Sequence, residues 1–510
     1  MDSYRSNYLK TYLWKVIAII VNFASFIVVV PYLSSNPQLY GIYTFCISFQ
    51  LYLSYADIGF LSAGQKFAAE AFARNDREDE TRIFGFVGAV LIVMILPFSA
   101  LMIYLAYSPD VAINGVLEEN KGIVSTLFII LAVVTPIQVV LQRLVQSILT
   151  IRVKDYVSAR VDVVGSIIKI LSVFYFFTGG RYLLTYYFLF INSVTIITSL
   201  IVIGIIRRTE HYDILALLKS IRFSKKYFDL MKKLAFTSLG ATISWIICYE
   251  LDLILIGKVF TVQEVSLYAV CFTLINYLRH LFNIIYGPYG QRFNHFIALN
   301  QEDNIKKMLI NIVKYTFPIC LFVCALMSSS SRYIILTWVG SNYEGSIVVL
   351  AILSWFYIFH FITQPANYVC IATKKYKTIN FLSIASPIVF IGSFVIMHQI
   401  GVGYVSFAIA KLLMVLATLL IMGKELSNWI NIWKTISNYL PLLIVMLVIV
   451  LVSNNLNQAV LPQPSKSTTQ LITLFMLFAG YAVIYSIFVI VFDKHLRDKA
   501  SNLIHNFIIR

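Results

Sequence analysis

Long apolar runs are the feature of this sequence that most restricts its fold. A helix needs about 20 apolar residues to cross the hydrocarbon layer of a bilayer, and such runs recur along nearly the whole 510-residue chain. Only 13% of the residues are charged, about half the share that is usual in a globular protein. The sequence therefore predicts an all-α polytopic membrane protein.

Counting these runs gives about fourteen candidate membrane spans. The first six cover residues 12–33, 39–60, 83–106, 122–147, 156–177 and 182–206. The remainder cover 234–257, 265–286, 308–328, 346–371, 379–398, 402–422, 440–455 and 470–492. We therefore expect an N-terminal lobe (1–206), a basic cytoplasmic linker (207–233), a C-terminal lobe (234–437), and a final pair of helices with a cytoplasmic tail (438–510).

The basic residues indicate how the spans are oriented. The chain carries 40 Lys and Arg against 24 Asp and Glu. With the N-terminus in the cytoplasm, the outer loops hold only a few of the Lys and Arg residues: Lys121, Arg181, Lys258, Arg332 and Lys466. This bias follows the positive-inside rule, so we expect both termini in the cytoplasm. The net charge of +16 then requires no nucleic-acid partner.

Two short matches indicate an internal repeat. The stretch NPQLYGIYTFCISFQLY (36–52) can be laid on TVQEVSLYAVCFTLINY (261–277), and ILTIR (148–152) on IATKK (371–375), at nearly the same offset. Because this offset corresponds to an even number of spans, the two halves should have the same orientation in the membrane. The connection 207–233 between them alternates apolar and basic residues, which fits either a lipid-binding segment or a plain interfacial linker, and the linker is the simpler interpretation.

Polar residues inside the spans indicate which helix faces look inward. An ionisable side chain in a bilayer usually faces the bundle interior or a water-filled cavity. Lys169, Arg279 and Lys411 lie near the middle of their spans, so we expect them to line a cavity, with Lys314 as a weaker member. Further candidates at helical spacing are Lys15, Asn22, Asp57, Asp162, Asn276, His280 and His360.

Glu250 and Asp252 interrupt the outer half of the span 234–257. On an ideal helix they are separated by about 200°, so only one of them should face the centre of a cavity. Buried carboxylates are candidates for proton or sodium coupling. The plainer interpretation is that they and Asp162 neutralise the cations within the spans, while Lys15 and Asp57 reach the inner surface.

Two parts of the sequence resemble a known family. LYGIYTF (39–45) followed by YADIGFLSAGQKFAAEAFARND (55–76), and ELDLILIGKVFTVQEVSLYAV (250–270), are similar to O-antigen and polysaccharide flippases of the multidrug/oligosaccharidyl-lipid/polysaccharide (MOP) exporter superfamily. The resemblance implies two parallel six-helix lobes around a central cavity, with two extra C-terminal helices. Asp252 matches the acidic position expected in the seventh span, and Glu250 is additional.

The resemblance also implies a function. Such proteins move undecaprenyl-diphosphate-linked sugar repeat units from the inner to the outer leaflet of the bacterial cytoplasmic (inner) membrane, for O-antigen or other surface polysaccharide and lipopolysaccharide synthesis. This implies a transporter without a cofactor, with membrane lipids, a polysaccharide polymerase and a chain-length regulator as partners. A drug-cation antiporter of the same superfamily is the closest alternative. A membrane polymerase fits less well because the outer loops are short and poor in His, Asp and Arg.

The orientation can be tested with single cysteines in a cysteine-free background. Three positions in outer loops should react with a membrane-impermeant thiol reagent added outside: Asn114, Ser341 and Gln463. Three positions in inner loops should stay unlabelled: Asn75, Ser224 and Ser427. Labelling of a cysteine at 224 from the outside would reverse the predicted orientation.

Overall fold

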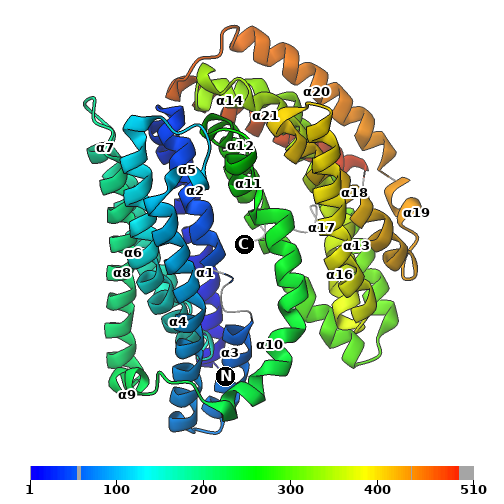
Figure 1. Cartoon of the computed structure of the whole chain (residues 1–510). Helices are drawn as coiled ribbons and strands as arrows, with labels where there is room; N and C mark the ends of the chain where they lie inside the picture. Colours follow the sequence, from blue (N-terminus) through cyan, green and yellow to red (C-terminus); the bar gives the residue numbers. More distant parts are fainter. Residues whose placement is uncertain (1, 54, 56–58, 438, 493–510) are drawn as a thin grey trace. The chain divides into compact units, whose positions relative to one another are not determined.

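The structure is a computed structural model that describes residues 2–53, 55, 59–437 and 439–492. Throughout this part of the chain, every regular element is a helix (Figure 1). The chain divides into two compact units, Met1–Ser266 (unit 1) and Leu267–Arg510 (unit 2). The boundary falls inside one long helix, α12 (Val262–Ala298). The predicted all-α fold class is confirmed.

Unit 1 is a bundle in which α4, α6 and α8 pack side by side and α7 lies between α1 and α8. Its helices are α1 (Asp2–Leu33), α2 (Pro37–Leu53), α3 (Phe60–Ala73), α4 (Arg77–Tyr107), α5 (Pro109–Ala112), α6 (Glu118–Thr150), α7 (Tyr156–Phe176), α8 (Leu184–Thr209), α9 (Ile214–Lys219), α10 (Lys225–Trp245), the π-helical turn η1 (Ile246–Glu250) and α11 (Asp252–Val259). The carboxylate of Asp76 begins α4 by accepting a hydrogen bond from the Asp79 amide at 2.9 Å. Acidic residues in the first turn of α4 also complement the positive end of its helix dipole.

Unit 2 contains α13, α15, α16, α17 and α18, of which α18 packs against α15, α16 and α17. A second layer is formed by α20 and α21, which contact each other and α13. The elements after α12 are α13 (Glu302–Ser329), α14 (Ser331–Trp338), η2 (Ser341–Tyr343), α15 (Ser346–Phe356), η3 (Tyr357–Phe359), α16 (His360–Ala372), α17 (Tyr376–Gln399), η4 (Gly403–Val405), α18 (Ser406–Ser427), α19 (Ile432–Ser437), α20 (Leu440–Val460) and α21 (Thr468–Phe492).

The number of membrane spans is close to the prediction. Within the described residues, eleven helices are long and apolar enough to cross a membrane, or twelve if the bent pair Leu239–Glu250 and Asp252–Val259 is one span. Two of the fourteen predicted spans, 39–60 and 156–177, are not among these twelve. The helix α2 has 17 residues, and α7 carries Arg160, Asp162 and Lys169 along its 21 residues. The count of about fourteen therefore stays a prediction.

The predicted span 234–257 is a broken helix rather than a continuous one. The helix α10 passes into η1, and α11 begins at Asp252 after a bend of 55°. A π-helical turn changes the angular position of every residue after it, so the angle expected for a straight helix does not apply across Leu251. The segment contacts α2 and α3 and therefore packs within unit 1.

The connection 207–233 is docked on unit 1. Its helix α9 contacts α4 at the end of the unit where α8 ends (Figure 1), and Leu217, Tyr227 and Met231 are buried in the core of that unit. The backbone of Ser220 lies directly on Gly85 of α4, where a Cβ atom would come within 2.3 Å of the Ser220 carbonyl oxygen. The linker is thus an integral part of the bundle.

Replacing Gly85 by Ala should loosen this docking. The new methyl group must displace the Ser220 backbone, and overpacking of this kind costs about 1–3 kcal/mol, more than the helix gains from losing a glycine, about 0.5–1 kcal/mol. Gly88 is the matched control, because a Cβ there meets Leu144 at 3.4 Å, an ordinary contact. Thermal unfolding in detergent should show a lower transition temperature for Gly85→Ala and an unchanged or higher one for Gly88→Ala. Equal temperatures would mean that the linker moves aside without cost.

Candidate functional site

Glu250 and Asp252 lie on either side of the break between η1 and α11. Both are buried, with exposed fractions of 2% and 0%. The Glu250 Oε1 atom accepts hydrogen bonds from the Tyr55 hydroxyl at 3.2 Å and from the Trp245 indole Nε1 at 3.3 Å. The Trp245 ring stacks on Tyr249 with 4.2 Å between ring centroids. These contacts hold the Glu250 carboxyl group in a fixed position.

A tyrosine on α2 links the two acidic residues. Tyr52 is half-buried and its hydroxyl is buried. This hydroxyl lies within electrostatic range of both Asp252 and Glu250, and both η1 and α11 contact α2. Both carboxyl groups therefore act on the same hydroxyl, although a straight helix would separate them by about 200°. We call Tyr52, Tyr55, Trp245, Glu250 and Asp252 the acidic site. A buried carboxyl group is stabilised by taking up a proton or a cation.

Lys169 is held between two helices of unit 1. Its ammonium group on α7 donates to the Thr195 hydroxyl on α8 at 2.5 Å. It also interacts electrostatically with Asp162, two turns earlier on α7. This geometry supports the structural interpretation that the sequence left open, in which Lys169 and Asp162 compensate one another.

Lys411 is the most deeply buried of the four predicted cations. It is 4% exposed, and its ammonium nitrogen lies 5.7 Å and 5.8 Å from the ring centroids of Phe272 and Phe390. Aromatic faces attract a cation through their quadrupole, so these rings help to stabilise the charge within unit 2. A ligand could contact Lys411 only if the surrounding side chains moved.

Arg279 and His360 come together in unit 2, from α12 and α16. Arg279 is half-buried and lies within electrostatic range of His360. The buried His360 ring packs against Tyr357 at 4.7 Å and Phe282 at 6.0 Å between centroids. Arg279 therefore combines a fixed charge with partial exposure, which a ligand-binding cation requires.

The other predicted site residues are distributed over both units. Lys314 on α13 and Asn276 on α12 are half-buried, and His280 on α12 is exposed. Lys15 and Asn22 are exposed on α1. Asp57 lies outside the described residues.

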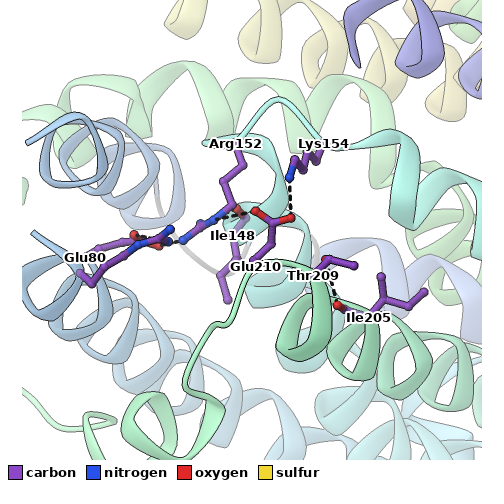
Figure 2. A network of polar contacts seen from close by, with 8 residues as sticks. Glu80, Ile148, Arg152, Lys154, Ile205, Thr209 and Glu210 are labelled. Atoms are coloured by element: carbon purple, nitrogen blue, oxygen red, sulfur yellow. Dashed lines mark hydrogen bonds and ion pairs between the residues drawn. The ribbon is translucent and has the colours of Figure 1, made fainter. Parts of the chain in front are cut away.

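A second charged cluster, which the sequence analysis did not single out, lies near the linker in unit 1 (Figure 2). The Arg152 side chain is 1% exposed, and its Nη2 atom lies 2.6 Å from Glu80 Oε1. Its Nε atom lies 3.9 Å from Glu210 Oε2, and Lys154 contacts the same glutamate at 2.6 Å. The guanidinium also packs against the Tyr212 ring at 5.1 Å. We call Glu80, Arg152, Lys154 and Glu210 the charge cluster.

The charge cluster joins three turns that are distant in sequence. Glu80 begins α4, Arg152 and Lys154 lie in the turn after α6, and Glu210 follows the end of α8 within the linker. Burial raises the pKa of the neighbouring Tyr212 to about 12, so this hydroxyl stays neutral at physiological pH. In the sequence, Arg152 stands out only as the end of the repeat match ILTIR (148–152). Glu80 and Glu210, two acidic residues at other helix ends, were the sequence signal that Arg152 and Lys154 could form ion pairs.

Comparison with known proteins identifies the fold. Neither a protein-family profile nor a curated protein sequence matches the chain. A structure of the lipid II flippase MurJ in an inward closed conformation matches with a TM-score of 0.68 at 15% sequence identity. The matched region covers 98% of this chain and 99% of the flippase chain.

Multidrug resistance transporters of the MATE family, within the MOP superfamily, also match. An inward-facing structure has a TM-score of 0.63 at 13% sequence identity, and the match covers 82% of this chain and 96% of the transporter chain. An outward-facing structure has a TM-score of 0.53 at 12% identity and covers 84% and 96%. At such identities the likeness shows the fold alone. The chain is a multi-pass membrane protein with the fold that the MurJ flippase and MATE transporters share.

Proposed function

We propose that this chain flips undecaprenyl-diphosphate-linked oligosaccharide repeat units across the bacterial cytoplasmic membrane by alternating access, for O-antigen or another surface polysaccharide. The observation that carries the proposal is the extent of the likeness to the lipid II flippase, 98% of this chain against 82% and 84% for the two multidrug transporters. In this proposal both termini are cytoplasmic. A polysaccharide polymerase and a chain-length regulator would use the flipped product.

The chemistry of the substrate indicates what the protein must supply. A hydrated, anionic diphosphate headgroup must cross about 30 Å of hydrocarbon, and fixed cations can replace its lost hydration. Arg279 is the leading candidate because it is half-buried and a guanidinium holds phosphate oxygens in a bidentate fork. Lys314 shares this partial exposure. We propose that Lys169 and Lys411 contribute to the positive potential while held by Thr195 and by the phenylalanine rings, respectively.

A drug-cation antiporter is the second candidate function. The acidic site favours it, because buried carboxylates such as Glu250 and Asp252 can bind a cation or exchange a proton. In a flippase the same site would couple transport to a proton or sodium gradient. The two functions differ in the sign of the charge on the transported molecule, and this difference decides the experiment.

Reconstituted protein should translocate the anionic lipid-linked oligosaccharide. The measurement is the fraction of headgroups in proteoliposomes that a membrane-impermeant glycosidase can reach. Arg279→Glu should abolish translocation and Arg279→Lys should reduce it less, because losing a hydrogen bond to a charged group costs about 1.5–3 kcal/mol, or roughly 10–100-fold in affinity. Arg292→Glu, an exposed position on the same helix, is the matched control and should remain active.

Two results would contradict this assignment. If Arg279→Glu translocates normally, or if Asp252→Lys restores its activity, Arg279 is part of a structural ion pair rather than a substrate site. If the wild-type protein exports a cationic dye but leaves the oligosaccharide in place, the antiporter is the correct function. Each variant must first insert at the wild-type level, as measured by fluorescence-detected size-exclusion chromatography.

Removing the charges of the acidic site should uncouple transport. The double variant Glu250→Gln, Asp252→Asn keeps the shape of both side chains but cannot release a proton or hold a cation, so its transport rate should no longer respond to a pH or sodium gradient. The measurement is the initial rate in proteoliposomes with and without each gradient. Glu119→Gln, at an exposed glutamate in the first turn of α6, should respond like wild type. A double variant with full gradient dependence would exclude the coupling role.

A further inference from the structure

A groove lies between α17 and α18 in unit 2, at the ends of these helices that the sequence predicts to be cytoplasmic. Its volume is about 470 Å³, within the range of roughly 300–1,000 Å³ that is usual for ligand sites. Lys377 and Thr378 line it from the first turn of α17, and Lys424 and Glu425 line it from the last turns of α18. Its walls include Phe381.

The charged side chains at the lysine end of this groove have a net positive charge. The Glu425 carboxylate is engaged by the Lys375 ammonium group and by the Thr378 hydroxyl, the latter at 2.8 Å. Lys375 therefore balances Glu425. Lys377 and Lys424 are both exposed, and no carboxylate of the described residues forms an ion pair with either. Two ammonium groups thus remain at the mouth of the groove to bind an anion.

The apolar wall continues along both helices away from the lysines. On α17, Phe381 is followed by Ile384 and Ile388, which are 65% and 64% exposed. These spacings of three and four residues place the side chains on one face of the helix. On α18, Leu420 is 76% exposed, and Leu416 and Leu413 precede it at the same spacing. The positive end is therefore continuous with an apolar track that leads into the depth of the membrane.

We propose that this groove binds an anionic glycerophospholipid of the inner leaflet. The phosphate lies between Lys377 and Lys424, and an acyl chain follows Phe381 and Leu420 along the apolar track. Basic pockets between membrane helices on the cytoplasmic side suit such headgroups. A free phosphate ion would use the two lysines but gain nothing from the apolar wall, and a zwitterionic lipid would bring its own cation into a site that is already positive.

Native mass spectrometry of the full-length protein tests the proposal, with phosphatidylglycerol and phosphatidylcholine of identical acyl chains as probes. Wild type should retain phosphatidylglycerol with a preference of about tenfold. The double variant Lys377→Gln, Lys424→Gln should lose this preference. The matched control replaces Lys306 and Lys307, a lysine pair at the start of α13, with Gln and should keep it. Leu420→Ser should weaken retention of both lipids without changing the preference.

Competition experiments distinguish the alternative occupants. Phosphatidylglycerol should remain bound in the presence of millimolar inorganic phosphate, and displacement by phosphate would overturn the assignment in favour of a simple anion site. Undecaprenyl phosphate at equal concentration should displace it only in part, and complete displacement would show that the groove takes the prenyl carrier instead. An unchanged preference in Lys377→Gln, Lys424→Gln would refute the site altogether. Thermal unfolding of each variant confirms that a lost lipid does not reflect a lost fold.

Discussion

Every charge that this chain buries must be compensated inside a largely apolar bundle. An uncompensated charge costs several kcal/mol there, and breaking a buried pair costs about 3–5 kcal/mol. The chain meets this requirement in different ways. Arg152 is paired with Glu80 at 2.6 Å, Lys169 donates to Thr195, and the Lys411 ammonium group lies 5.7 Å and 5.8 Å from the centroids of two phenylalanine rings. In unit 1, the pair of Arg152 and Glu80 also joins the turn after α6 to the first turn of α4.

The charge cluster has consequences for how the protein can move. It joins the beginning of α4 and the turn after α6 to the beginning of the linker, and the Tyr227 hydroxyl adds a hydrogen bond to Asp79 at 2.8 Å. Together with the close contact between Ser220 and Gly85, these interactions make 207–233 part of unit 1. The parallel halves predicted from the sequence, joined by a long connection, would lead one to expect that the connection acts as a flexible joint. A linker docked in this way moves with unit 1 instead.

The sequence predicts most of the fold because its strongest signal, the apolar run, is local. Glu250 and Asp252 could also be found from sequence, since two carboxylates in an apolar run are costly wherever they point. Their surroundings could not, because the Tyr55 hydroxyl that binds Glu250 is 195 residues away. The π-helical turn was missed for a related reason. The turn packs against α2, which is distant in the sequence, and no residue type in 246–250 requires it.

The acidic site and the cation Arg279 belong to different compact units, with Glu250 and Asp252 in unit 1 and Arg279 in unit 2. Coupling between two sites does not require that they touch, only that uptake of a proton or cation at one changes the equilibrium between conformations that bind the substrate differently at the other. Such coupling is reciprocal, so substrate binding must change the affinity of the acidic site by the same factor. In a flippase of this kind, a diphosphate bound at Arg279 would therefore alter the proton or cation occupancy of two carboxyl groups in the other unit.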